Sequence, residues 1–347
     1  MRTGLRSGVQ VLAILLLGSG TVAAQLSGTV ERPNVFGAAL EGNLLGESDS
    51  PEVTIYLPPS YETDSDRRYP VVYFLHGYGL TDQGYMGPGG PFELLEAADR
   101  AFVSGVARDM IVVAPNGYNR FGGSMYSSSV TTGDWEAYVA DDLVAYVDAN
   151  YRTIARRESR GLSGHSMGGY GTLRIGMKRP DVFSALYSMA ACCLMNGQAE
   201  GGRGGGVTAG QAEQGQSGRG RGRGGFNTSG AQAAAWAPNP NNPPDYSDLL
   251  VVDSEPQPRV SALFHANSPL VMVPQYVTNL KKYTAIAGDV GLGDRLSSTN
   301  IELAELLETL GVDYRFETFD GDHTNRVAER FEAIMLPFLS EVLEFAE

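Results

Sequence analysis

The chain has 347 residues, 42% of them hydrophobic, and its formal net charge is −14 at neutral pH. This length is enough to bury one large core, and we expect a single domain over residues 25–347. So strong a negative charge disfavours nucleic acids and anionic surfaces as partners.

The first 24 residues have the pattern of a secretory signal peptide. Arg2 and Arg6 precede an apolar run over residues 9–17, and the small residues Val22-Ala23-Ala24 follow it. This order is typical of a cleaved export signal, and the run is too short to cross a bilayer as a helix. We therefore predict that residues 1–24 are removed and that the mature chain begins near Gln25. We expect that chain to be secreted or periplasmic, with no stable membrane insertion.

Apolar runs that predict strands alternate with runs that predict helices. Strands are predicted at 53–57, 70–75, 110–115, 159–163, 183–189, 283–288 and 314–319, and helices at 135–150, 169–177, 299–310 and 325–345. Buried strands separated by amphipathic helices indicate an α/β fold with a mostly parallel central sheet and helices on both faces. Active sites in such folds lie beyond the carboxyl ends of the strands.

Residues 197–244 interrupt this alternation. They are rich in glycine, carry an Arg-Gly repeat over 219–225, and end in a tail rich in Pro and Asn. Such a composition cannot bury enough apolar surface to offset the entropy of ordering, so we predict a disordered insertion that flanks the mouth of the site. The repeat resembles nucleic-acid-binding segments, but the acidic remainder of the chain argues against that partner.

The sequence Gly164-His165-Ser166-Met167-Gly168-Gly169 lies between a predicted strand and a predicted helix. This arrangement is typical of a nucleophile elbow, in which a serine on a sharp strand-to-helix turn projects its hydroxyl from the sheet. Glycines flank Ser166 because the strand and helix backbones approach too closely for a Cβ atom. We interpret Ser166 as a nucleophile.

A serine hydroxyl needs a base to take its proton, and histidine is suited to that task. The chain has four histidines. His165 should point away from the hydroxyl, His76 fits a role in shaping its own loop, and His265 lies in a predicted helix. His323 remains, and it follows the last predicted strand, where the order Ser, Asp, His places the base.

The acid of this triad should fall between the serine and His323, at the end of a strand, where it can orient the imidazole. Asp289 and Asp294 both follow the strand predicted at 283–288. Asp294 is favoured because it lies nearer the start of the next helix, and Asp289 is the alternative.

Backbone amides must stabilise the negative oxygen that forms when a serine attacks a carbonyl. One is the amide of Met167, directly after the nucleophile. The second is expected from the loop after the strand at 70–75, from Tyr78 or alternatively from Gly79. Trp135 is a candidate for substrate binding, although packing of a buried aromatic under the preceding loop is the favoured explanation.

The only two cysteines, Cys192 and Cys193, are adjacent in the sequence. Adjacent cysteines suit neither a loop-closing disulfide nor a metal site. We interpret them as buried residues at a strand end, with a strained disulfide between neighbours as the alternative.

Four segments together resemble the esterase D family of α/β hydrolases, also described as putative esterases. They are residues 56–61, 68–77 and 164–169, and Gly321-Asp322-His323. The family includes feruloyl esterases, S-formylglutathione hydrolases, siderophore esterases and mycolyltransferases of the antigen 85 type. The resemblance covers about residues 41–345 apart from the insertion, and it implies the α/β-hydrolase fold with Ser166, His323 and Asp294 or Asp289 as the triad.

The resemblance further implies a serine carboxylesterase that works through an acyl-enzyme intermediate and needs no metal or nucleotide cofactor. Because the chain carries an export signal, we expect small-molecule or polysaccharide-linked esters, of the feruloyl or acetyl type, as substrates. The alternatives are an acyltransferase of the mycolyltransferase type and a non-catalytic binding module with the same fold.

Overall fold

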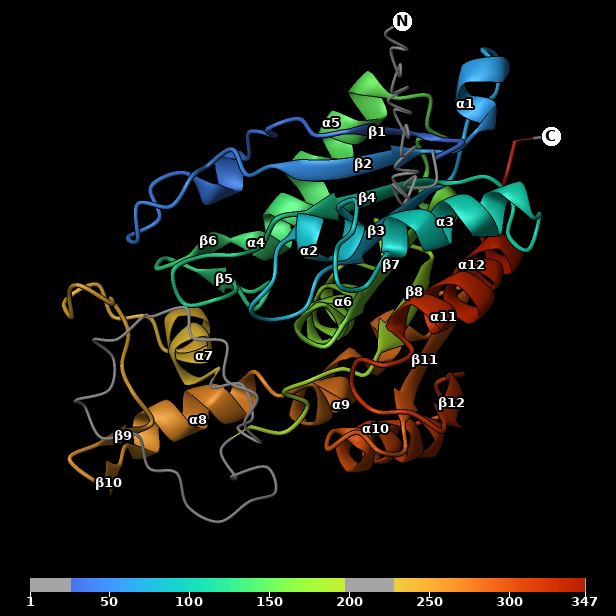
Figure 1. The fold of residues 1–347 in the computed structure, drawn as a ribbon. Coiled ribbons are helices and arrows are strands. Elements are labelled where there is room, and N and C mark those ends of the chain that lie inside the picture. The colour runs from blue at the N-terminus through green and yellow to red at the C-terminus, as the bar shows by residue number, and fades with distance from the viewer. Residues whose placement is uncertain (1–25, 197–227, 347) are drawn as a thin grey trace, which may run out of the picture.

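An eight-stranded sheet organises the part of the chain that the computed structural model describes, residues 26–196 and 228–346. In Figure 1 the sheet runs from β1 at its upper edge to β12 at its lower edge. In spatial order the strands are β1 (Thr29–Glu31), β2 (Val53–Leu57), β4 (Ile111–Pro115), β3 (Val71–Leu75), β7 (Arg160–His165), β8 (Ala185–Met189), β11 (Ala285–Gly291) and β12 (Arg315–Phe319). β2 is antiparallel to both of its neighbours, and the pairs from β4 to β12 are parallel.

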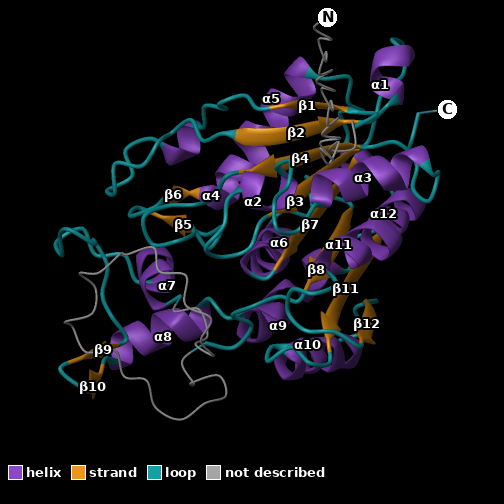
Figure 2. Ribbon diagram, in the orientation of Figure 1, coloured by secondary structure: helices purple, strands orange, loops and turns teal. Residues whose placement is uncertain are grey.

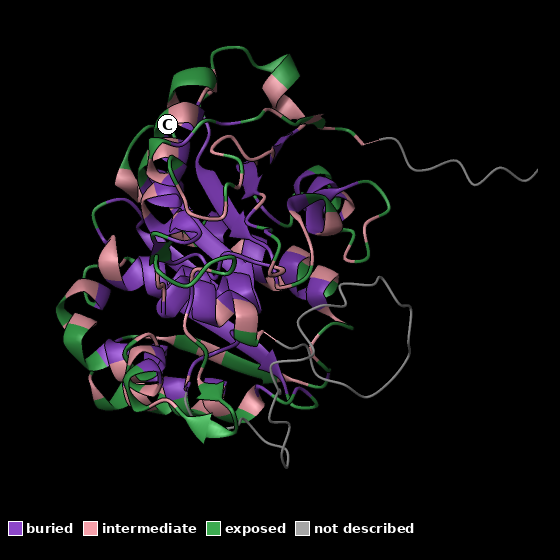
Figure 3. Ribbon diagram, turned by 90° about the vertical axis from the view of Figure 1, so that its left-hand side faces the viewer, coloured by how far each residue is buried: buried purple, intermediate pink, exposed green. Residues whose placement is uncertain are grey.

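Helices cover both faces of this sheet (Figure 2). One face is covered by α5 (Leu143–Asn150), α6 (Met167–Lys178), α9 (Pro269–Leu280) and α10 (Ser297–Thr309), and the other by α3 (Leu94–Val103), α11 (Val327–Arg330) and α12 (Leu336–Val342). Side chains alternate between the two cores along a strand, so Tyr73 of β3 lies in the first core and its neighbour Phe74 lies in the second. Figure 3 shows the buried strands between the more exposed outer helices.

The α/β fold expected from the sequence is confirmed, with local differences in the helices. Both long predicted helices contain a π-helical turn, Tyr138–Asp142 between α4 (Trp135–Ala137) and α5, and Phe331–Met335 between α11 and α12. The described chain also contains short helices and hairpins: α1 (Ser60–Thr63), α2 (Asp82–Met86), α7 (Ser229–Trp236), α8 (Pro258–Ala266), 3-10 helices at Ala38–Leu40 and Arg157–Ser159, β5 (Ser128–Ser129) with β6 (Gly133–Asp134), and β9 (Val251–Val252) with β10 (Glu255–Pro256). None of the helices in this part of the chain combines the length and apolar character needed to cross a bilayer.

The prediction of disorder over 197–244 is wrong for its C-terminal part. Residues 229–236 form α7, and Trp236 is buried with its ring 5.4 Å from the ring of Tyr170 on α6. This segment is ordered because its alanines and Trp236 supply an apolar face. The mean composition of residues 197–244 conceals that face, because the many glycines dominate it. Residues 197–227 and the predicted signal peptide lie outside the described residues.

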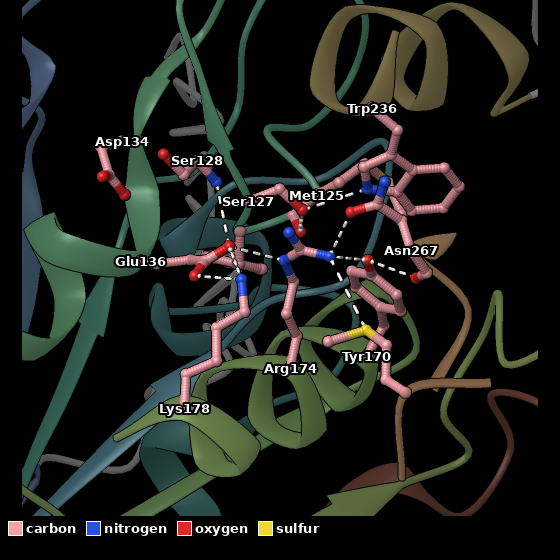
Figure 4. A network of polar contacts seen from close by, with 12 residues as sticks. Met125, Ser127, Ser128, Asp134, Glu136, Tyr170, Arg174, Lys178, Trp236 and Asn267 are labelled. Carbon is pink, nitrogen blue, oxygen red and sulfur yellow. Dashed lines mark hydrogen bonds and ion pairs between the residues drawn. The ribbon is translucent and has the colours of Figure 1, made fainter. Parts of the chain in front are cut away.

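A buried polar network fixes α6 to the elements around it (Figure 4). The Arg174 guanidinium donates to Glu136 of α4 and to the Asn267 side chain before α9, both at 2.6 Å. Lys178 donates to the same carboxylate at 2.7 Å. Burial would raise the pKa of Glu136, but the two cations hold it below its ordinary value. The network therefore connects α6, the helix that follows Ser166, to α4 and to the segment before α9.

Candidate active site

Ser166 occupies a strained turn between β7 and α6. Its φ of 57° lies in the left-handed region that non-glycine residues rarely adopt. A Cβ atom on Gly164 would lie 2.6 Å from the Gly168 carbonyl carbon, and one on Gly168 would lie 1.8 Å from the Leu75 carbonyl oxygen. Only glycine fits at these two positions, so the sequence pattern around Ser166 is a direct consequence of backbone contact.

The structure brings Ser166, His323 and Asp294 into one chain of hydrogen bonds. The Ser166 hydroxyl lies 2.9 Å from His323 Nε2, and His323 Nδ1 lies 2.6 Å from Asp294 Oδ2. Because a carboxylate only accepts, Nδ1 carries the hydrogen and Nε2 is left to accept from the serine. The Asp294 side chain is fully buried, whereas 21% of the His323 side chain is exposed. The site is therefore open to solvent on the imidazole side.

Asp289, the alternative acid, lies elsewhere. β11 extends to Gly291, further than predicted, so Asp289 is inside the strand rather than after it. Its carboxylate accepts from the Tyr187 hydroxyl and from Arg330 Nε, each at 2.8 Å. Burial raises the pKa of Asp289 despite the guanidinium beside it. The carboxylate that contacts His323 is that of Asp294.

Of the two candidate sources of the second oxyanion amide, Gly79 already has a backbone acceptor. The Gly79 amide donates to the Gly122 carbonyl at 2.9 Å, so it is occupied by the loop over residues 116–134. Met167 is the first residue of α6, and the first amides of a helix have no acceptor within the helix. The Gly79 contact disfavours Gly79 as the second donor, and Tyr78 stays the predicted partner of Met167.

The remaining sequence candidates have structural contacts. His76 is fully buried, its Nε2 accepts from the Gly117 amide at 2.8 Å, and burial lowers its pKa to about 4, so it shapes the loop as a neutral ring. His265 lies on α8 and contacts the Asn196 carbonyl at 2.8 Å. The substrate-binding role considered for Trp135 does not fit the structure, because the ring is 5% exposed and packs against Tyr138.

Cys192 and Cys193 are buried thiols in the loop after β8, which ends at Met189, and their sulfur atoms lie 2.7 Å apart. The Cys192 amide donates to the Ser166 carbonyl at 3.1 Å, and this hydrogen bond helps to hold the turn between β7 and α6. Within residues 26–196 and 228–346, no group of three or more His, Cys, Asp or Glu side chains is placed to hold a metal ion.

Sequence reasoning missed one residue near the site. Tyr85 lies on the short helix α2, is 2% exposed, and contacts His165 with its hydroxyl at 2.7 Å. No motif marks a tyrosine at this place, because its importance arises only from the packing of α2 against the end of β7.

Comparison with known proteins identifies the family of the chain. Residues 48–336 match the protein family described as Putative esterase. The chain belongs to this family. The resemblance inferred from the sequence motifs is thus confirmed, and the chain is a member of a family of carboxylic ester hydrolases.

Individual relatives match shorter regions. "Esterase Rv1288" of Mycobacterium tuberculosis is 35% identical over 140 residues, which are 40% of this chain and 28% of that protein. The "Endo-1,4-beta-xylanase/feruloyl esterase" of Xylanibacter ruminicola is 30% identical over 135 residues, which are 37% of this chain and 18% of that protein. The chain thus spans less than a third of the length of these two relatives.

Among solved structures, a ferulic acid esterase superposes with a TM-score of 0.64 at 22% sequence identity, over 92% of this chain and 100% of that chain. The serine hydrolase FphF of Staphylococcus aureus superposes with a TM-score of 0.59 at 17% identity, over 91% of this chain and 99% of that chain. At these identities the likeness shows the fold, which is that of the α/β hydrolases.

Proposed function

We propose that this protein is a secreted serine carboxylesterase in which Ser166, His323 and Asp294 act as nucleophile, base and acid. The observation that carries the proposal is the hydrogen-bonded chain from the Ser166 hydroxyl through His323 to the buried Asp294 carboxylate. A neutral imidazole held between a hydroxyl and a carboxylate is the arrangement that makes serine nucleophilic at neutral pH.

The mechanism follows from these contacts. Ser166 Oγ attacks the ester carbonyl while His323 Nε2 takes its proton, and the amides of Met167 and Tyr78 donate to the negative oxygen. His323 then gives the proton to the leaving alcohol, which leaves an ester between the acyl group and Ser166. Water loses a proton to His323, attacks that ester, and releases the acid.

The acyl group is proposed to be feruloyl or acetyl, on an ester carried by a small molecule or a polysaccharide. Support comes from relatives whose names include feruloyl esterase and from the N-terminal export pattern of Arg2, Arg6 and the apolar run after them.

The proposal is tested with the mature chain from Gln25 and p-nitrophenyl acetate, p-nitrophenyl butyrate and methyl ferulate as substrates. We expect hydrolysis by the wild type and a loss of at least about 10⁴-fold in kcat for Ser166→Ala. Mass spectrometry of the quenched wild type should detect the acyl group on Ser166. If the wild type is no faster than Ser166→Ala on every ester, the protein is a binding module rather than an esterase.

A further inference from the structure

His165, the residue before the proposed nucleophile, takes no part in the mechanism above. Its ring is 1% exposed at the end of β7 and lies 4.7 Å from the ring of His323, measured between centroids. Burial, and secondarily the neighbouring His323, lowers the pKa of His165 to about 3, so the ring is neutral wherever the enzyme is folded and active. A buried neutral imidazole beside the catalytic base requires a physical explanation.

The contacts of His165 determine which nitrogen carries its hydrogen. Nε2 lies 2.9 Å from the backbone carbonyl oxygen of His323, and Nδ1 lies 2.7 Å from the Tyr85 hydroxyl. A carbonyl can only accept, so Nε2 must be the donor. In a neutral ring Nδ1 is then an acceptor, and the Tyr85 hydroxyl donates to it. Both nitrogens of His165 are therefore satisfied in a single tautomer.

Tyr85 is itself held in place. Its ring stacks on Phe92 with the centroids 4.4 Å apart. Its hydroxyl also lies against the backbone of Gly77, in the loop that leads to Tyr78, where a Cβ atom would be 2.3 Å from the hydroxyl oxygen. Burial raises the pKa of Tyr85 far above its ordinary value, so the hydroxyl keeps its hydrogen. A continuous set of contacts thus runs from the oxyanion loop through Tyr85 and His165 to the backbone of His323.

His323 needs such a support because of where it lies. It is in the loop between β12, which ends at Phe319, and α11, which begins at Val327. No helix or strand hydrogen bond fixes its carbonyl, and the donor that reaches it is the side chain next to Ser166. The residue that precedes the nucleophile is therefore in direct contact with the main chain of the base.

We propose that His165 is a positioning residue for the reaction, and that Tyr85 orients it. His165 donates from Nε2 to the main chain of His323, and this contact keeps the imidazole of His323 within hydrogen-bond reach of Ser166. This inference rests on the proposed function. Its consequence is that the donor at Nε2 matters for turnover, while substrate binding does not depend on it.

A matched pair of substitutions tests the donor. In His165→Gln the amide nitrogen lies near the position of Nε2 and can still donate to the His323 carbonyl, whereas the shorter side chain in His165→Asn reaches only to the position of Nδ1. We expect kcat to fall by about 100-fold in His165→Asn, since displacement of a catalytic group by about 1 Å costs this much, and by much less in His165→Gln. KM should change by no more than about twofold in either variant.

Tyr85→Phe tests the orienting hydroxyl. This variant leaves Nδ1 of His165 buried without a donor, and we expect kcat to fall about tenfold with KM retained. Tyr56→Phe is the matched control, because it also removes a buried tyrosine hydroxyl, one that donates to Asp99 at 2.8 Å on the antiparallel side of the sheet. That variant should lose stability but keep kcat.

Nitrogen-15 NMR of histidine-labelled protein reads the tautomer directly, and the chain has only four histidines to assign. We expect one ring that stays neutral with its hydrogen on Nε2 between pH 5 and 8 and that is absent in His165→Gln. His76 and His323 are expected to carry their hydrogen on Nδ1, so the diagnostic ring is the one whose signal is lost in His165→Gln. A hydrogen on Nδ1 of that ring, or equal kcat in the Gln and Asn variants, would overturn the inference. If Ser166→Ala and His323→Ala abolish activity while every His165 variant matches the wild type, the inference fails and the proposed function stands. Full activity in Ser166→Ala would instead remove the proposed function.

Discussion

At the scale of single residues, Asp294 and Asp289 show how the partner of a carboxylate decides its role. Asp294 faces His323, and its second oxygen accepts from the Leu296 amide at 2.9 Å, which fixes the carboxylate in its loop. Asp289 faces Arg330 and Tyr187 inside the sheet. Asp294 thus orients the His323 imidazole, and Asp289 neutralises the buried Arg330 guanidinium.

This difference predicts opposite outcomes for two isosteric substitutions. Asp294→Asn should lower kcat by about 10⁴-fold with little change in melting temperature, because the amide no longer selects the imidazole tautomer that can accept from Ser166. Asp289→Asn should lower the melting temperature and leave kcat within a few-fold of the wild type. Steady-state kinetics and thermal unfolding of both variants measure this, and a larger kcat loss in Asp289→Asn would contradict the assignment of the acid.

Asp82 predicts a pH dependence of stability. It is fully buried, its Oδ2 accepts from Thr54 at 2.5 Å, and its Oδ1 has no partner among the described residues. Burial raises its pKa from 3.8 to about 6. Because the folded state holds the proton more tightly, the contribution of Asp82 to stability is fully present below pH 4 and is lost as the pH rises through 6.

Asp82→Asn should therefore stabilise the protein at pH 7.5, by about 1–2 kcal/mol, and have little effect at pH 4. The amide still accepts from Thr54 but carries no charge. Urea unfolding at both pH values measures the difference. Equal stabilisation at pH 4 and pH 7.5 would show that the carboxylate does not titrate in this range.

At the scale of elements, two glycines of α6 differ in what blocks a side chain. A Cβ on Gly168 would meet the Leu75 carbonyl oxygen at 1.8 Å, which is backbone, whereas one on Gly176 would meet the Leu186 side chain at 2.5 Å. The Leu186 side chain can change rotamer to make room. The Leu75 carbonyl cannot move unless β3 also shifts against the strands with which it pairs. Gly168→Ala should therefore abolish activity or folding, while Gly176→Ala should fold and retain kcat. Soluble yield, circular dichroism and kinetics compare the two variants.

Element boundaries were predictable only where the sequence itself marks them. The wholly apolar runs predicted β3 and β4 well, because both faces of these strands are buried and every side chain carries the signal. The end of β11 was missed, since Asp289 looks like a loop residue until Arg330 from α11 is seen to neutralise it. Tyr85 was missed for a similar reason: its role depends on a contact with a residue 80 positions away in the chain.

At the scale of the whole molecule, the alternation of strands and helices predicted the fold, and the glycine-flanked serine predicted the end of the sheet where the candidate site lies. The boundary of the insertion was not predictable from composition, because α7 follows the glycine-rich stretch directly and is held by contacts with α6 and with the 116–134 loop. In these contacts Trp236 donates to the Ser127 hydroxyl at 3.1 Å, and Ser129 donates to the Ala234 carbonyl at 2.6 Å.

These contacts predict that α7 and the sheet unfold together, as expected of a single domain over residues 25–347. The chain has two tryptophans, Trp135 beside the sheet and Trp236 on α7. In Trp135→Phe the fluorescence reports on α7 alone, and in Trp236→Phe it reports on the sheet side alone. Within each variant, the urea transition by fluorescence should coincide with the transition by circular dichroism. If α7 is instead a separate unit, the fluorescence of Trp135→Phe will change at lower urea than its circular dichroism, while the two probes still coincide in Trp236→Phe.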